Sequence, residues 1–250
     1  MMLSDSIRRK NPLVHCISNI VSANDCANLL LAVGASPIMA QAPEEMADVA
    51  AMADALVLNI GTPSREKLEA CRIAGITANS KNIPVILDPV GVGASSWRLL
   101  QITELLQAVH PSIIRANAAE ARALLGLSAG EHGVDNADEE SESESTLAQN
   151  LAAKYNCTVL LSGAFDTVSD AKQTVTITGG SPRMKQITGA GCMLSALCGA
   201  FASVTEPFMA AEEAAVLWKR GAEYAEKQAG TRGLGSFHAA LFDALSLLQL

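Results

Sequence analysis

The chain has 250 residues, of which 49% are hydrophobic, 18% are charged and only 4% are aromatic, so aliphatic residues must form most of its core. The formal net charge is −8, but five acids lie in one short run at residues 138–145, and removing them leaves −3. No basic cluster points to nucleic acid or a membrane surface as a partner. The length is ordinary for one α/β domain, and we expect a single domain over residues 1–250.

The six cysteines form no C-x-x-C pair and have no histidine-rich set beside them, which argues against a zinc site. Residues 1–10 carry charges that no apolar stretch follows, so no secretion signal is visible. No apolar run is long enough to span a bilayer without Pro, Gly or a charged residue. We therefore expect a cytoplasmic protein with free thiols and no membrane partner.

Short apolar runs alternate with helical segments along the chain. The expected strands are 13–17, 36–39, 55–59, 84–87, 112–116 and 158–162, followed by a hairpin at 166–169 and 173–178. The expected helices are 24–34, 43–53, 64–80, 97–109, 117–125, 146–155, and segments near 191–203, 207–228 and 235–248. Because most strands are continuous apolar runs, we predict an α/β fold with a mostly parallel central sheet, helices on both faces and an antiparallel edge.

One segment stands outside this alternation. Residues 138–145 read DEESESES, a low-complexity acidic run. Such a composition cannot bury enough apolar surface to order itself, so we expect a flexible surface loop.

Polar and glycine residues gather where the predicted strands end. In parallel sheets, ligands bind at the carboxyl ends of the strands, so these residues are candidates for a site. They are Asn19, Met39, Asn59 with Gly61 and Thr62, Asp88 with Gly91 and Gly93, Arg115 with Asn117 and Glu120, and Ser162 with Gly163.

A glycine-rich turn at residues 187–195 (ITGAGCMLS) opens a predicted buried helix. The free amides and the dipole at such a helix start favour an anion, and glycine lets the backbone approach it. Gly189, Ala190, Gly191 and Cys192 therefore form a candidate phosphate loop. Cys192 would lie at the first turn, where a thiolate is stabilised. The alternative is a glycine start of a core helix that carries a buried structural cysteine.

Two further motifs also allow two interpretations. Asn117 and Glu120 are spaced as in a capping box, and on spacing alone this structural interpretation is favoured over a functional one. In a kinase, Arg115 would instead contact nucleotide phosphates, and Glu120 would act through water on Mg²⁺. Asp88 begins a turn before a helix cap, or it lies near a metal-bound phosphate. Loops of this kind at successive strand ends, together with the phosphate loop, favour phosphoryl transfer.

Other candidates are weaker. His15 lies inside an apolar strand and is expected to be a core histidine. Ser162 lacks the G-x-S-x-G context of a hydrolase nucleophile.

Four segments resemble the hydroxyethylthiazole kinase family. They are residues 14–28 (VHCISNIVSANDCAN), 34–40 (GASPIMA), 87–95 (LDPVGVGAS) and 188–192 (TGAGC). The similarity extends over nearly the whole chain, and the first and third segments are specific to this family.

The resemblance implies a ribokinase-like fold, use of ATP and Mg²⁺, and phosphorylation of 4-methyl-5-(2-hydroxyethyl)thiazole in thiamine salvage. It also implies a homotrimer with active sites between subunits. Met39 and Gly189 match substrate-contacting residues, and we group Asn19 with them. Arg115 and Ser162 match ATP-contacting residues, and we group Asn117 with them. Cys192 occupies the place of the usual catalytic Asp of the wider superfamily, and we assign Asp88 and Glu120 to Mg²⁺ through water.

The chain also departs from the family pattern: Ala116 and Ala171 stand where Gly is usual, and Ala119 stands where Ser is usual. Three rivals remain open. One is an ATP-dependent lyase of the same fold, such as the repair dehydratase of hydrated nicotinamide nucleotides. The second is a kinase for another heteroaromatic alcohol, and the third is a non-catalytic nucleotide-binding module. The 19–28 stretch and Cys192 favour the thiazole kinase.

Overall fold

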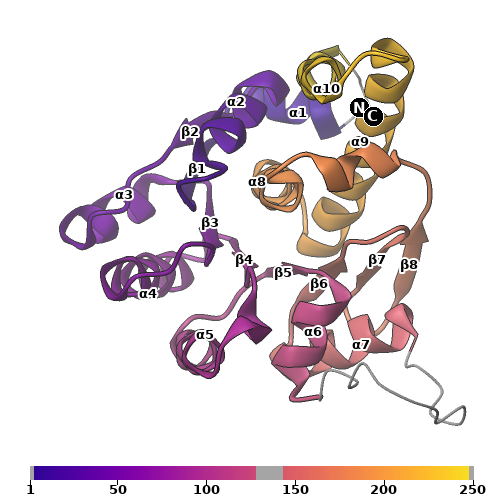
Figure 1. The fold of residues 1–250 in the computed structure, drawn as a ribbon. Coiled ribbons are helices and arrows are strands. Elements are labelled where there is room, and N and C mark those ends of the chain that lie inside the picture. The colour runs from indigo at the N-terminus through magenta and orange to yellow at the C-terminus, as the bar shows by residue number, and fades with distance from the viewer. Residues whose placement is uncertain (1–2, 128–142, 248–250) are drawn as a thin grey trace, which may run out of the picture.

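The computed structural model describes residues 3–127 and 143–247, and one eight-stranded sheet runs through them (Figure 1). The strand order is β2-β1-β3-β4-β5-β6-β7-β8. The strands are β1 (Leu13–Ile17), β2 (Ser36–Ile38), β3 (Ala55–Asn59), β4 (Val85–Asp88), β5 (Ile113–Ala116), β6 (Thr158–Leu161), β7 (Asp166–Ser169) and β8 (Thr174–Ile177). Strands β1 to β6 are parallel, whereas β7 and β8 are antiparallel at one edge, which confirms the predicted sheet.

Helices cover both faces of this sheet. They are α1 (Leu3–Lys10), α2 (Ala23–Val33), α3 (Met46–Met52), α4 (Arg65–Ser80), α5 (Ser96–Ala108), α6 (Ala118–Leu125), α7 (Glu144–Tyr155), α8 (Ala190–Ala202), α9 (Pro207–Ala229) and α10 (Leu234–Leu247). Short 3-10 segments are η1 (Pro43–Glu45), η2 (Val92–Ala94) and η3 (Pro182–Gln186).

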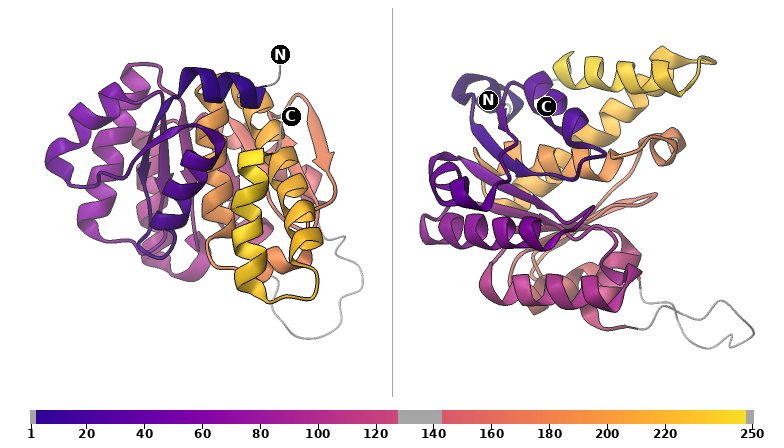
Figure 2. Two further views of the ribbon diagram at one scale, coloured as in Figure 1. Left: turned by 90° about the horizontal axis from the view of Figure 1, so that it is seen from above. Right: turned by 60° about the vertical axis from the view of Figure 1, so that its left-hand side comes forward.

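The apolar core has two layers, one on each face of the sheet. On one face, α1, α2, α8, α9 and α10 pack together, and α9 and α10 lie side by side (Figure 2). On the other face, α3 to α7 pack against the strands. Helix α8 is buried along nearly its whole length from Met193 onward, as the apolar sequence predicts.

The structure departs from the expected elements in three places. Helix α1 is not predicted by the sequence analysis; its Ile7 is fully buried, so tertiary packing stabilises this short segment. The predicted helix over 43–53 is split into η1 and α3. Most of the acidic run lies outside the described residues, but helix α7 already begins at Glu144, with Ser143 as its N-cap. The predicted loop over 138–145 is therefore wrong at its carboxyl end.

Candidate active site

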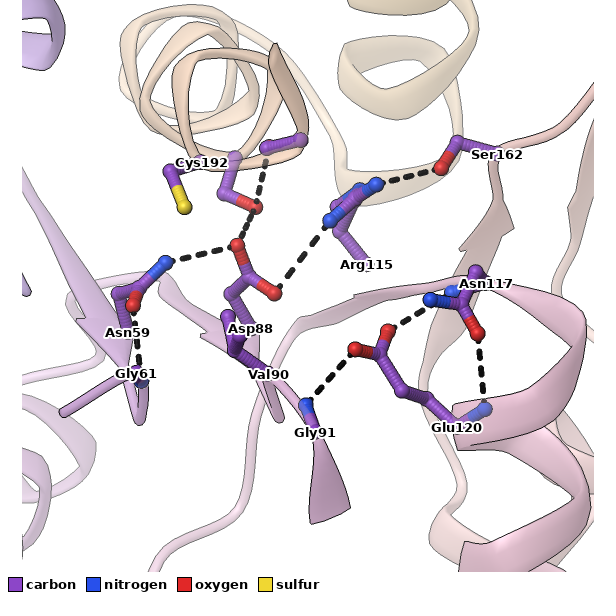
Figure 3. Close-up of polar contacts among 12 residues, drawn as sticks. Asn59, Gly61, Asp88, Val90, Gly91, Arg115, Asn117, Glu120, Ser162 and Cys192 are labelled. Carbon is purple, nitrogen blue, oxygen red and sulfur yellow. Dashed lines mark hydrogen bonds and ion pairs between the residues drawn. The ribbon is translucent and has the colours of Figure 1, made fainter. Parts of the chain in front are cut away.

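Five strands that neighbour one another in the sheet deliver five polar side chains, which form one hydrogen-bonded row. Asn19 follows β1, Asn59 ends β3, Asp88 ends β4, Arg115 lies in β5 and Ser162 follows β6. The contacts are Asn19 Nδ2 to Asn59 Oδ1 at 2.9 Å, Asn59 Nδ2 to Asp88 Oδ2 at 2.8 Å, Arg115 Nη1 to Asp88 Oδ1 at 3.4 Å, and Arg115 Nη2 to Ser162 Oγ at 2.5 Å. Figure 3 shows the row from Asn59 to Ser162.

Asp88 is the buried centre of this row. Its side chain is fully buried, and its oxygens also accept a hydrogen bond from Ser195 Oγ on α8 at 2.8 Å. Burial raises the pKa of Asp88, and the positive charge of Arg115 opposes that increase. Two neutral donors, Asn59 and Ser195, and the Arg115 cation therefore hold this carboxylate in one orientation.

Arg115 joins the row to a large cavity. The cavity has a volume of about 490 Å³ and is lined by Arg115, Ser162, Gly163, Gly180, Gly191 and Lys219, among others. Arg115 is 8% exposed, so its charge is largely withdrawn from water. A buried guanidinium that faces such a space can bind a phosphate through its fork of donors.

A second charged pair lies on another wall of this cavity. Lys219 Nζ lies 3.1 Å from Asp166 Oδ1 and also donates to the carbonyl oxygens of Gly163 and Ala164 at 3.2 and 3.1 Å. Burial raises the pKa of Asp166, whereas the Gly163 amide and Lys219 lower it. No local sequence motif marks this pair, because Lys219 comes from the middle of α9.

The glycine turn has the geometry expected of a phosphate loop. Gly189 precedes α8 with φ +79°, a left-handed conformation that favours glycine. A Cβ at Gly189 would also come within 2.7 Å of Ser22 Cβ. The first helical hydrogen bond runs from Met193 N to Gly189 O at 2.8 Å, so the amides of residues 190–192 precede the helical bonding and can hold an anion.

Cys192 lies in the first turn of α8 and is half-buried. Its Sγ accepts a hydrogen bond from Asn19 Nδ2 at 3.2 Å. The structure thus brings Asn19, Gly189 and Cys192 into one region of the site. Met39 follows β2, beyond β1 in the sheet, and packs against the core layer of α2 and α8.

Glu120 forms the capping box that its spacing predicts. Asn117 Oδ1 accepts from Glu120 N at 2.9 Å, and Glu120 Oε2 accepts from Asn117 N at 3.0 Å. The other oxygen, Oε1, accepts from Gly91 N at 2.9 Å, so Glu120 joins the loops that follow β4 and β5 (Figure 3). The ATP role of Asn117 and the metal role of Glu120 stay predictions.

Three buried polar residues in or beside the row had no role assigned from the sequence. Ser195 lies one turn beyond Gly191 on α8, and Asn59 was identified only as a strand end. Lys67 is 8% exposed, and its Nζ donates to Gly61 O at 2.7 Å. Desolvation lowers the pKa of Lys67 to about 8. Lys67 also lines a second cavity of about 450 Å³, together with Ser18, Ile20 and Thr62.

His15 is a buried core histidine, as the sequence analysis expects. Its Nε2 lies 2.9 Å from Ala40 O, and desolvation lowers its pKa. The contact ties β1 to the segment that follows Met39.

The sequence model of the hydroxyethylthiazole kinase family matches residues 4–250. The chain belongs to this family. A hydroxyethylthiazole kinase of Listeria monocytogenes serotype 4a is 45% identical over 98% of this chain and 91% of its own length. A solved structure of the hydroxyethylthiazole kinase protein of Pyrococcus horikoshii OT3 is 39% identical, with a TM-score of 0.90 over 99% of this chain and 92% of that one.

Membership in the hydroxyethylthiazole kinase family makes this chain a phosphotransferase that acts on an alcohol, and it does not favour the lyase alternative. The fold is ribokinase-like: a ribokinase-like superfamily protein of Enterococcus faecalis V583, only 15% identical, has a TM-score of 0.65 over 93% of this chain and 86% of that chain. Within residues 3–127 and 143–247, no helix combines the length and the apolar character needed to cross a membrane.

Proposed function

We propose that this chain transfers the γ-phosphoryl group of ATP to the hydroxyl of 4-methyl-5-(2-hydroxyethyl)thiazole, a step of thiamine salvage, as a single cytoplasmic kinase domain over residues 1–250. The observation that carries the proposal is the hydrogen-bonded row from Asn19 to Ser162, which joins the Cys192 side of the phosphate loop to the cavity beside Arg115. The six free cysteines support a reducing compartment.

The cavity beside Arg115 is the proposed ATP site. Arg115 and Ser162 line it, Asn117 follows β5, the strand of Arg115, and Ala190 and Gly191 at the start of α8 line the same cavity. A guanidinium and helix-start amides are suited to a polyphosphate. In a loose transition state, these groups neutralise charge and hold the reacting atoms in line.

Asp88 and Glu120 are the proposed magnesium-binding residues. Among the described residues no group of three or more His, Cys, Asp or Glu could hold a metal ion directly. The oxygens of both carboxylates are already hydrogen-bonded, which suits contact through water. Mg²⁺ keeps several waters and binds largely to substrate phosphates, so this donor set fits it. When bound, Mg²⁺ neutralises phosphate charge.

The acceptor alcohol is proposed to bind on the Cys192 side of the row, with Met39, Asn19 and Gly189 as contacts. Cys192 would take the proton of the attacking hydroxyl or hold that hydroxyl in line. Because a loose transition state requires little base assistance, positioning by this loop contributes more than the basicity of the thiol.

The proposal includes self-association as a homotrimer with active sites between subunits. Ile20 and Val21 follow Asn19 directly and are 80% and 61% exposed, and Leu31 on α2 is 59% exposed. Exposed apolar side chains beside a candidate substrate residue support the proposal that a neighbouring subunit completes the pocket. Light scattering that finds a fully active monomer would contradict this part.

The decisive experiment is an assay of ADP release with a panel of heteroaromatic primary alcohols, ATP and Mg²⁺. We expect the thiazole alcohol to give the highest kcat/KM. A pyridoxal or pyrimidine alcohol as the better acceptor would favour a kinase for that alcohol instead. Nucleotide binding without turnover of any alcohol would favour a binding module.

A further inference from the structure

We propose that Asn59 is a positioning residue for Cys192: it fixes the amide of Asn19 so that this amide donates a hydrogen bond to the Cys192 sulfur. The inference rests on the proposed function, because it assigns Asn59 a part in the same reaction. Asn59 bonds to Asn19, which in turn bonds to Cys192 of the phosphate loop, and it is 2% exposed.

The orientation of the Asn59 amide follows from its partners. Asp88 is a carboxylate that accepts from Asn59 Nδ2 at 2.8 Å, and the Gly61 amide donates to Asn59 Oδ1 at 3.0 Å. A flipped amide would place oxygen against the carboxylate and NH₂ against the Gly61 N–H, which loses both bonds. Asn59 therefore has one orientation, with its oxygen available to Asn19.

The same argument then fixes Asn19. Asn19 Nδ2 donates to the oxygen of Asn59 at 2.9 Å, while Asn19 Oδ1 accepts from the amides of Val21 and Ser22 at 3.0 and 3.1 Å. This leaves one further N–H on Nδ2, which lies 3.2 Å from Cys192 Sγ. The sulfur is thereby a hydrogen-bond acceptor on this side, and the Asn19 amide fixes its position.

Asp88 holds the other end of the relay, by which we mean the hydrogen bonds from Asp88 through Asn59 and Asn19 to Cys192. Arg115 holds one of its oxygens at 3.4 Å, and Ser195 holds the other at 2.8 Å, so the carboxylate cannot turn away from Asn59. Asn59 thus links the region of the proposed nucleotide and metal to the thiol on the acceptor side. An apolar residue at position 59 would break this link without touching Cys192.

The first test is a double-mutant cycle with the full-length enzyme, measured with ATP and the thiazole alcohol. Asn59→Ala and Asn19→Ala should each lower kcat at least about tenfold, and the double variant should lose little more, since both act through one contact. The KM for ATP should change less than about twofold. Asn79→Ala is the control, because it too removes an asparagine amide that both donates and accepts, here with the backbone of His110, far from the row. Full kcat in Asn59→Ala, or additive losses, would overturn the inference.

Asn59→Asp distinguishes a positioning role from a structural one. Because aspartate is nearly isosteric with asparagine, this variant also keeps the test possible if Asn59→Ala does not fold. Only the protonated form of the introduced carboxyl group can donate to Asp88 and still accept from Asn19. Relative to the unmodified enzyme, the kcat of this variant should recover as the pH falls from 8 to 6. A ratio that stays constant over this range would contradict the relay.

A third measurement needs no substrate. Because the Asn19 amide, held by Asn59, is a hydrogen-bond donor to Cys192 Sγ, Asn19→Ala and Asn59→Ala should change the rate of iodoacetamide labelling of Cys192 at pH 7 several-fold and equally, when labelling is followed by peptide mass spectrometry. Asn79→Ala should not. If the unmodified enzyme phosphorylates no thiazole alcohol, the proposed function fails while this series still decides the positioning role. Unchanged labelling in both variants would refute the positioning.

Discussion

The Arg115 guanidinium lies directly over Gly191: a Cβ at position 191 would collide with both of its terminal nitrogens. Glycine is therefore required here for close approach, and the candidate nucleotide residue and the phosphate loop form one unit. Any side chain at Gly191 must move Arg115 away from Asp88 and Ser162.

We expect Gly191→Ala to raise the KM for ATP about tenfold or more, because the displaced Arg115 no longer faces the cavity. Gly221→Ala in α9 is the matched control. Its Cβ would meet Leu245 and Leu241 at 3.4 and 3.5 Å, an ordinary packing distance, so this variant should be neutral or slightly stabilised. Steady-state kinetics and the Tm of both variants test the expectation. A KM for ATP in Gly191→Ala equal to that of the unmodified enzyme would contradict it.

Arg115→Ala should weaken ATP binding more than thiazole binding. It also leaves the buried Asp88 carboxylate without its cation, which costs about 3–5 kcal/mol for a buried pair. Arg115→Lys is the companion variant, since it keeps the charge and loses the planar fork. Calorimetric Kd values for ATP and the thiazole alcohol provide the measurement. A higher Kd for the thiazole alcohol with an unchanged Kd for ATP would contradict this assignment.

Cys192→Ala should slow turnover by less than the roughly 10²–10⁴-fold assigned to a good general base. Cys192→Asp should fold and stay active, because a carboxylate at this position can accept the hydrogen bond that Asn19 donates to the sulfur. The two kcat values and the two Tm values are measured together. Full kcat in Cys192→Ala with an unfolded Cys192→Asp would show that Cys192 is only a core residue.

Lys67 makes stability depend on pH in a defined window. Desolvation lowers its pKa from 10.5 to about 8 in the folded protein. Between pH 8 and 10.5 the unfolded chain therefore binds more protons, so Lys67 contributes stability that increases with pH, by about 3 kcal/mol at most. Lys67→Met should lack this increase in urea unfolding.

The Lys67 experiment has to compare the two proteins at each pH. Burial raises the pKa of Cys26, Cys71 and Cys198 to about 12, so ionisation of these thiols in the unfolded chain lowers stability in the same range. The contributions of Cys26 and Cys198 cancel in the difference between wild type and Lys67→Met, whereas the charge of Lys67 lowers the pKa of Cys71, so loss of Lys67 also changes the contribution of that thiol. A difference that is flat from pH 7 to 10.5 would rule out the lowered Lys67 pKa.

Ala171→Gly should stabilise the protein by about 0.5–1 kcal/mol without changing kcat. Ala171 lies in the turn between β7 and β8 with φ +70°, a left-handed conformation that is strained for alanine and open to glycine. Asn156→Gly, at φ +50°, should change Tm less, because asparagine tolerates this conformation. A lower Tm for Ala171→Gly than for wild type would contradict the strain.

Local pattern in the sequence determined the elements and much of the site. Continuous apolar runs predicted buried parallel strands, since both faces of such strands are covered. The carboxyl ends of parallel strands share one edge, so Asp88, Arg115 and Ser162 were predicted as candidates for a site at that edge. The capping box at Asn117 was also predicted, because its partners lie three residues apart.

Tertiary structure alone decided which strands lie side by side and which side chains meet. The order β1-β3-β4 puts Asn59 between Asn19 and Asp88, and no local period encodes that order. Ser195 reaches Asp88 across 107 residues of sequence. Helix α1 depends on burial of Ile7, not on its own propensity. Sequence periodicity sets which face of an element is apolar, but contacts between distant segments arise only when those faces pack.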